Sequence, residues 1–222
     1  DALGNRIDDP RLTLVRADFR FIHNFVLATA HDNEVLRDRL QKGLDGILAD
    51  LGVSSHQFDT AERGFSFRYD APLDMRMNRD GGITAEDVVN EYSQEDLERI
   101  FKLYGEVDNS RKIASLVVSA RSKGRIGTTA ELDKAIESAL PKFAEHKFLA
   151  KVYQALRIEV NHEMRSLEKF LEGAAASLNE GGILAVITYH SLEDRMVKNY
   201  IRTGNAEGKE ETFNITEFIS DF

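Results

Sequence analysis

The stretch Ile47-Leu48-Ala49-Asp50-Leu51-Gly52 joins a short apolar run to an acid and a glycine. A run of this length that ends at a glycine is typical of a β-strand. Its nearly continuous hydrophobicity favours a parallel sheet buried on both faces. Ligands of open parallel sheets bind beyond the carboxyl ends of the strands. We therefore expect Asp50 to lie at a binding site.

A second apolar run, Ile183–Ile187, is followed after Thr188 by Tyr189-His190-Ser191-Leu192-Glu193-Asp194-Arg195. These polar residues predict a second strand end at the same edge of the sheet. His190 is a candidate base, a candidate phosphate contact or a structural histidine. Asp50 either accepts hydrogen bonds from an amino group or caps the turn at Val53–Ser55. Glu193 and Asp194 fit the first turn of a helix, where acids complement the helix dipole.

The rest of the chain reads as one further strand and a series of helices. Leu12–Val15 is the predicted strand. Helices are predicted at Phe19–Ala30, Glu34–Lys42, Asn109–Arg121, Thr129–Leu140, His146–Leu178 and Leu192–Ile201. Thr84 with Asp87, and Ser93 with Asp96, predict helix N-caps. Strands in both flanks, with a long helical stretch between them, indicate an open α/β sheet with an inserted helical domain.

Composition excludes several classes of protein and site. A net charge of −9 over 222 residues argues against coating nucleic acid through bulk charge. The absence of cysteine excludes disulfides and thiolate metal sites. No apolar run approaches the roughly 20 residues of a membrane helix, and residues 1–10 do not resemble a signal peptide. The histidines lack metal-ligand spacing, so no metal is expected.

Two segments combine the side chains that RNA binding requires. Residues 111–125 hold several cations and no acid, which indicates either a phosphate-binding patch or a solvated helix face with a loop. Residues 63–77 mix aromatic side chains with arginines, and either stack a nucleobase beside a phosphate or form a self-packed lid over the sheet edge. The candidate RNA-binding cations are Arg63, Arg68, Arg76, Arg111, Lys112, Arg121, Lys123 and Arg125.

Several ordered blocks are more specific than any short motif. They are Asp50–Ser55, Arg63–Phe67, Pro72–Met77, Tyr104–Glu106, Gln154–Ile158 with Val160-Asn161, and His190–Arg195 with Lys198. Over about Ile7 to Gly208 the chain strongly resembles the bacterial 16S ribosomal RNA cytosine-N4 methyltransferase family (MraW, also called RsmH).

The resemblance implies an α/β fold: a Rossmann-like S-adenosylmethionine-dependent methyltransferase sheet, residues 1–82 and 165–222, with an all-helical substrate-recognition domain inserted at 83–164. It implies S-adenosylmethionine as cofactor, contacted by Phe19, Asp50 and Gln57. Beyond the strand ends, we expect Asp50, Ser54, Ser55 and His190 to surround the target amine.

The resemblance also implies partners and a location. These are 16S ribosomal RNA within the small ribosomal subunit, no membrane, and the cytoplasm; a homodimer is left open. The family's glycine-rich cofactor loop and ribose-binding acid are expected before Asp1. The family's basic C-terminal segment is expected in place of residues 212–222. The resemblance therefore implies that the chain is a trimmed form of the enzyme. The alternatives are a non-catalytic RNA-binding or assembly module of the same fold, and a methyltransferase acting on DNA or a small amine.

Overall fold

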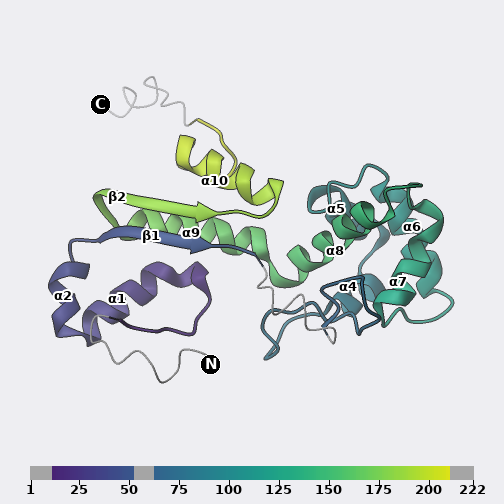
Figure 1. Cartoon of the computed structure of the whole chain (residues 1–222), viewed down its shortest axis with the longest axis horizontal. Helices are drawn as coiled ribbons and strands as arrows, with labels where there is room; N and C mark the ends of the chain where they lie inside the picture. Colours follow the sequence, from purple (N-terminus) through teal and green to yellow (C-terminus); the bar gives the residue numbers. More distant parts are fainter. Residues whose placement is uncertain (1–11, 53–62, 211–222) are drawn as a thin grey trace, which may run out of the picture. The chain divides into compact units, whose positions relative to one another are not determined.

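The computed structural model describes residues 12–52 and 63–210 (Figure 1). These residues form two compact units, one made of residues 12–52 with 164–210 and the other of residues 63–163. The first unit combines strands with helices, and the second is helical. None of the helices in the described ranges is long and apolar enough to cross a membrane.

A two-stranded parallel sheet forms the centre of the first unit. β1 (Leu44–Asp50) pairs with β2 (Leu178–Ile187), and Asp50 is opposite Ile187 in the register. The pairing continues past the end of β1, where the Leu51 amide donates to the Ile187 carbonyl at 3.1 Å. Both strands therefore end at the same edge. The predicted strands at 47–51 and 183–187 and their parallel pairing are confirmed.

Helices pack on one face of this sheet. The helices of the first unit are η1 (Phe19–Phe21), α1 (Ile22–Asp32), α2 (Glu34–Leu40), α9 (Glu163–Ser177) and α10 (Ser191–Thr203). Figure 1 shows α9 running alongside both strands. Ile47 and Leu51 share a buried core with Leu167, Phe170 and Leu171 of α9. Burial of these apolar side chains is the main force that holds α9 to the strands.

Two expectations for this unit are wrong. The strands are not buried on both faces, because Leu48 is 73% exposed and Ile183 is 70% exposed in the described structure. Side chains alternate along a strand, so Ile47 points into the core and Leu48 points away from it. Residues 12–15 lie within the described range but form no strand. Leu14 and Val15 remain exposed there, without a neighbouring strand to supply ladder hydrogen bonds.

The second unit is a set of short helices around its own core. It contains α4 (Ala85–Glu91), α5 (Gln94–Leu103), α6 (Ser110–Arg121), α7 (Thr129–Ile136), η3 (Glu137–Ala139) and α8 (Glu145–Asn161). Its fully buried side chains include Leu97, Ile100, Phe101, Ile113, Leu132, Ile136 and Leu156. Figure 1 shows α8 passing through the middle of this unit.

The helix starts were predictable from local sequence. Thr84 accepts a hydrogen bond from the Asp87 amide, and the Asp87 carboxylate accepts one from the Thr84 amide at 2.8 Å. Ser93 caps α5 by accepting from the Asp96 amide at 3.0 Å. Each cap provides a partner for an amide that the first helical turn cannot bond internally. Both predicted N-caps are confirmed.

The predicted single helix over 146–178 is wrong. The chain forms α8 and α9 instead, separated at His162, whose φ of 50° is in the left-handed region. The amide of His162 bonds back to the Glu159 carbonyl at 3.2 Å, which closes the end of α8. The apolar spacing continues across the break, so periodicity alone gave no sign of it.

Residues 63–82, which the sequence analysis assigned to the α/β domain, pack with the helices. Phe65, Leu73 and Met75 are buried in the core of the helical unit. Asn161 at the end of α8 holds this segment in place. Its Oδ1 accepts from the Met77 amide at 2.6 Å, and its Nδ2 donates to the Met75 carbonyl at 2.8 Å. Met75 has a φ of 56°, so these two bonds fix a backbone conformation that costs free energy.

We expect Asn161→Ala to lower the free energy of unfolding by about 1–3 kcal/mol, because it leaves polar backbone groups of Met75 and Met77 without partners. Chemical denaturation measures the change. Asn78→Ala is the matched control: Asn78 is exposed and accepts one bond from the Asp80 amide, so its effect should stay within about 0.5 kcal/mol. Equal stability of the Asn161 variant and the control would contradict this role.

Candidate functional site

The shared edge of the two strands brings Asp50 together with Tyr189. The Tyr189 hydroxyl donates to Asp50 Oδ1 at 2.8 Å, and both side chains are exposed. The hydrogen bond and the charge of Asp50 raise the pKa of Tyr189 above its ordinary value of 10.0. Asp50 Oδ2 makes no hydrogen bond within the described residues. This carboxylate thus keeps an acceptor oxygen open to a ligand.

Tyr189 was not among the site residues chosen from the sequence. The signal was present, since Tyr189 is the second residue after the end of β2, in the region expected for a ligand contact. The strand register, in which Asp50 is opposite Ile187, could not be obtained from the sequence. That register brings a tyrosine just beyond β2 within hydrogen-bond distance of the end of β1.

Gly52 makes this contact sterically feasible. Its φ of 89° is in the region that side chains rarely adopt. A Cβ at this position would lie 3.0 Å from Cδ2 of Tyr189. A residue larger than glycine would therefore strain the backbone and push the Tyr189 ring away from the strand end.

His190 serves as the N-cap of α10. Its Nδ1 accepts from the Glu193 amide at 3.4 Å, and its Nε2 lies 3.3 Å from Glu193 Oε1. The imidazole is only 9% exposed, and Glu193 is 4% exposed. The second Glu193 oxygen accepts from the Tyr189 amide at 2.8 Å. His190 and Glu193 thus fix the backbone that carries Tyr189. Glu193 and Asp194 occupy the first turn, as the sequence indicated.

Phe19 belongs to the same unit. It belongs to η1, where Asp18 caps the Arg20 amide at 3.0 Å. The Phe19 ring meets the ring of Phe170 edge-on, with centroids 5.4 Å apart, and remains 45% exposed. The remaining predicted residues of this site, Ser54, Ser55 and Gln57, lie outside the described residues.

Of the predicted RNA-binding arginines in 63–77, two have structural contacts. Arg76 pairs with Asp74 through Nε–Oδ1 at 2.7 Å, and this hydrogen bond raises the pKa of Arg76. Arg63 donates to the Arg76 carbonyl and lies 5.2 Å from the centre of the Phe65 ring, while burial lowers its pKa. Arg68 is exposed, and its guanidinium has no hydrogen bond or ion pair within the described ranges.

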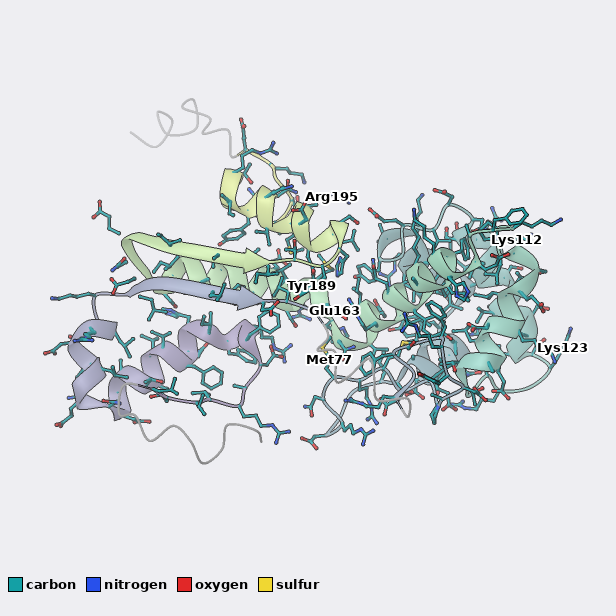
Figure 2. All side chains as sticks on the ribbon, in the orientation of Figure 1. Met77, Lys112, Lys123, Glu163, Tyr189 and Arg195 are labelled. Atoms are coloured by element: carbon teal, nitrogen blue, oxygen red, sulfur yellow. The ribbon has the colours of Figure 1, made fainter. Side chains whose placement is uncertain are left out.

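The five cations of 111–125 do not share one environment. Arg125 pairs with Glu86 and, at 3.5 Å, with Asp87, and Arg121 donates to the Val89 carbonyl at 2.9 Å. Lys112 is at the start of α6 and Lys123 follows its end. Figure 2 shows these two lysines at separate places on the helical unit. Arg111, Lys112 and Lys123 are exposed.

Comparisons with known proteins agree over nearly the whole chain. The model of a family described as the MraW methylase family matches residues 3–215. This chain is also similar to curated proteins named ribosomal RNA small subunit methyltransferase H. The protein from Bacteroides fragilis (strain YCH46) is 56% identical over 210 residues, which are 94% of this chain and 66% of that protein. A Flavobacterium psychrophilum protein is 48% identical over 211 residues, 95% of this chain and 69% of the relative. The chain therefore spans about two thirds of the length of these relatives.

We expect Asp50→Asn to lower the pKa of Tyr189 toward 10.0, because the variant removes the negative charge beside the phenol. In the unchanged chain the phenol donates to Asp50 below its raised pKa, and this contact is lost as the pH rises through that value. An NMR titration of ring-labelled tyrosine, assigned with Tyr189→Phe, measures the shift. Asp45→Asn, at the other end of β1, should leave the titration unchanged. An unaltered Tyr189 titration in Asp50→Asn would disprove the contact.

Proposed function

The chain belongs to the MraW methylase family, and from this we propose that it carries the methyl-transfer function of a ribosomal RNA enzyme. The enzyme transfers a methyl group from S-adenosylmethionine to the N4 amino group of a cytidine in 16S ribosomal RNA. The observation that carries the proposal is the match over residues 3–215, together with 56% identity to a relative named as a small-subunit ribosomal RNA methyltransferase.

The proposed architecture is a Rossmann-like methyltransferase sheet with an inserted helical domain for the RNA. Two features support it. The strands β1 and β2 are parallel, and polar residues follow both carboxyl ends. The helical unit lies between the two sequence segments that make up the α/β unit, which is the order that an insertion produces. The role of the helical unit in substrate recognition is part of the proposal.

The end of β1 fits a positively charged cofactor. Asp50 is exposed and keeps Oδ2 as a free acceptor within the described structure. The half-exposed Phe19 ring offers an apolar surface of the kind that packs against an adenine. S-adenosylmethionine supplies a methyl group on a sulfonium, which is a strong electrophile. Gln57 remains a proposed cofactor contact.

The chain's own contribution is to orient and stabilise the amine. The exocyclic nitrogen of cytosine is a weak nucleophile, since its lone pair is delocalised into the ring. A carboxylate that accepts an N–H from this amine stabilises the positive charge that develops on nitrogen. We assign this role to Asp50, with Tyr189 holding the carboxylate through the 2.8 Å hydrogen bond.

His190 keeps a place in the proposed site, but as a positioning residue. Its imidazole is nearly buried against Glu193, and Glu193 holds the Tyr189 amide. Since His190 acts through these contacts, we expect it to affect the orientation of Tyr189 rather than to remove a proton. Ser54 and Ser55 remain proposed neighbours of the target amine.

RNA phosphates are proposed to contact the cations that have no hydrogen-bond or ion-pair partner among residues 12–52 and 63–210. These are Arg68, Arg111, Lys112 and Lys123. Arg63, Arg76, Arg121 and Arg125, also chosen from the sequence, already bond to protein groups and contribute less. The proposed substrate is the RNA within the small ribosomal subunit, which locates the enzyme in the cytoplasm.

We expect Asp50→Ala to reduce methyl transfer by about 100-fold or more, because the developing charge on the amine loses its acceptor. The assay uses the Bacteroides fragilis relative with its matching segment replaced by this chain, acting on small ribosomal subunits from a strain without the enzyme. Mass spectrometry of digested RNA measures N4-methylcytidine.

Asp45→Ala is the matched control, because Asp45 is an exposed carboxylate at the opposite end of the same strand. It should retain turnover within about twofold, as expected of a surface substitution. Normal turnover by Asp50→Ala would remove Asp50 from the proposed mechanism. Methylation of DNA or of a small amine in place of cytidine would contradict the proposed function itself.

A further inference from the structure

The helical unit contains a cavity lined by residues other than those assigned to the methyl-transfer site. It has a volume of about 490 Å³ and lies between residues 65–69 and one face of α8. The side chains that matter here are Phe67, Arg68, Tyr69, Tyr153, Gln154 and Arg157. A volume of this size is within the range of ligand pockets, roughly 300–1,000 Å³.

One wall of the cavity is aromatic and rigid. The Phe67 ring packs edge-on against the Tyr153 ring, with centroids 5.6 Å apart. It also contacts the His146 ring in a tilted arrangement, with centroids 5.6 Å apart. Tyr153 is 4% exposed and donates to Asp133 Oδ1 at 3.0 Å. Burial raises the pKa of both Tyr153 and Asp133. Tyr153 thus supports the wall from the core, and the partly buried Phe67 ring is the aromatic surface that the wall offers for stacking.

Tyr69 lines the cavity, and hydrogen bonds hold its backbone while its ring is exposed. Its carbonyl accepts from Thr129 Oγ1 at 2.8 Å, and the same hydroxyl accepts from the Ala71 amide at 3.0 Å. The Tyr69 side chain is nevertheless 56% exposed. An exposed aromatic ring on an anchored backbone can stack on a ligand at a small entropic cost.

The polar groups of the cavity complement a nucleotide. Arg157 is neutralised by Glu163 through two contacts of 2.8 and 3.0 Å. Arg68 has no such partner in the described chain, so one cation is free for a phosphate. Gln154 Nε2 donates to the Tyr104 carbonyl at 2.8 Å, and its Oε1 has no hydrogen bond within the described residues. That oxygen can accept a bond from the amino group of a base.

We propose that this cavity binds one unpaired nucleotide of the RNA substrate. The base stacks on the aromatic side chains, and its phosphate meets Arg68. The inference rests on the proposed RNA-modifying function. Bases within a duplex are already stacked and cannot enter such a cavity, whereas loops and single strands present them splayed out. None of the residues that line it belongs to the Asp50–Tyr189 site.

The test measures binding of a fluorescein-labelled single-stranded RNA dodecamer to the 222-residue chain by anisotropy. Tyr69→Ala should weaken binding about 5- to 150-fold, the range for losing one stacked base. Tyr69→Phe keeps the ring and should bind within about twofold of the unchanged chain. Phe143→Ala is the matched aromatic control, because Phe143 is 99% exposed and outside the cavity; it should leave the affinity unchanged.

Salt dependence tests the phosphate contact separately. Arg68→Ala should reduce the slope of log affinity against log salt by about 1, as expected when one phosphate contact is lost. Lys142→Ala removes an exposed cation outside the cavity and should leave the slope unchanged. Thermal unfolding of each variant checks that the fold is retained.

Three outcomes would overturn the inference: no RNA binding by the chain, unchanged affinity in both Tyr69→Ala and Arg68→Ala, or equal binding of a duplex of the same length. The proposed function is tested independently, by measuring methyl transfer in the Bacteroides fragilis relative that carries this chain in place of its matching segment. If the chimeric enzyme methylates RNA but the cavity variants bind RNA with unaltered affinity, only the proposed nucleotide site in the cavity is rejected. Cavity-dependent binding without any methylation would reject the enzymatic proposal and leave the cavity in place.

Discussion

The parallel pairing of β1 with β2 determines which side chains meet at the candidate site. Parallel strands end at the same edge, so Asp50 and the residues after Ile187 become neighbours although the helical unit separates them in sequence. The Tyr189–Asp50 hydrogen bond exists because of this register. A shift of one residue would turn Asp50 to the opposite face and break the contact.

The helical unit is stabilised by its own core and by polar side chains that link distant backbone segments. Asn161, at the end of α8, bonds to Met75 and Met77 and so ties residues 63–82 to the helices. The arginines of this segment have different environments. Arg63 and Arg76 hold the segment together, while the neighbouring Arg68 remains free within the described structure.

Recognition of RNA by an acidic protein requires localised contacts. With a net charge of −9, long-range attraction does not favour RNA, and each free cation matters more than the total number. Stacking on aromatic side chains adds affinity that does not depend on charge. The cavity beside Tyr69, which we propose as a nucleotide site, combines aromatic surface with Arg68, whose guanidinium has no partner among the described residues.

The sequence by itself determined the family, the two paired strands and the N-caps at Thr84 and Ser93, and these were confirmed. Ordered motif blocks, strand hydrophobicity and capping are properties of contiguous residues, so they can be recognised without coordinates. The break at His162, the exposed face at Leu48 and the pairing of Arg125 with Glu86 were decided only by the tertiary structure. Each of these features depends on which distant segments come into contact. The spacing of apolar residues, or a run of cations, is the same in the sequence whether those side chains meet the core, solvent or a carboxylate.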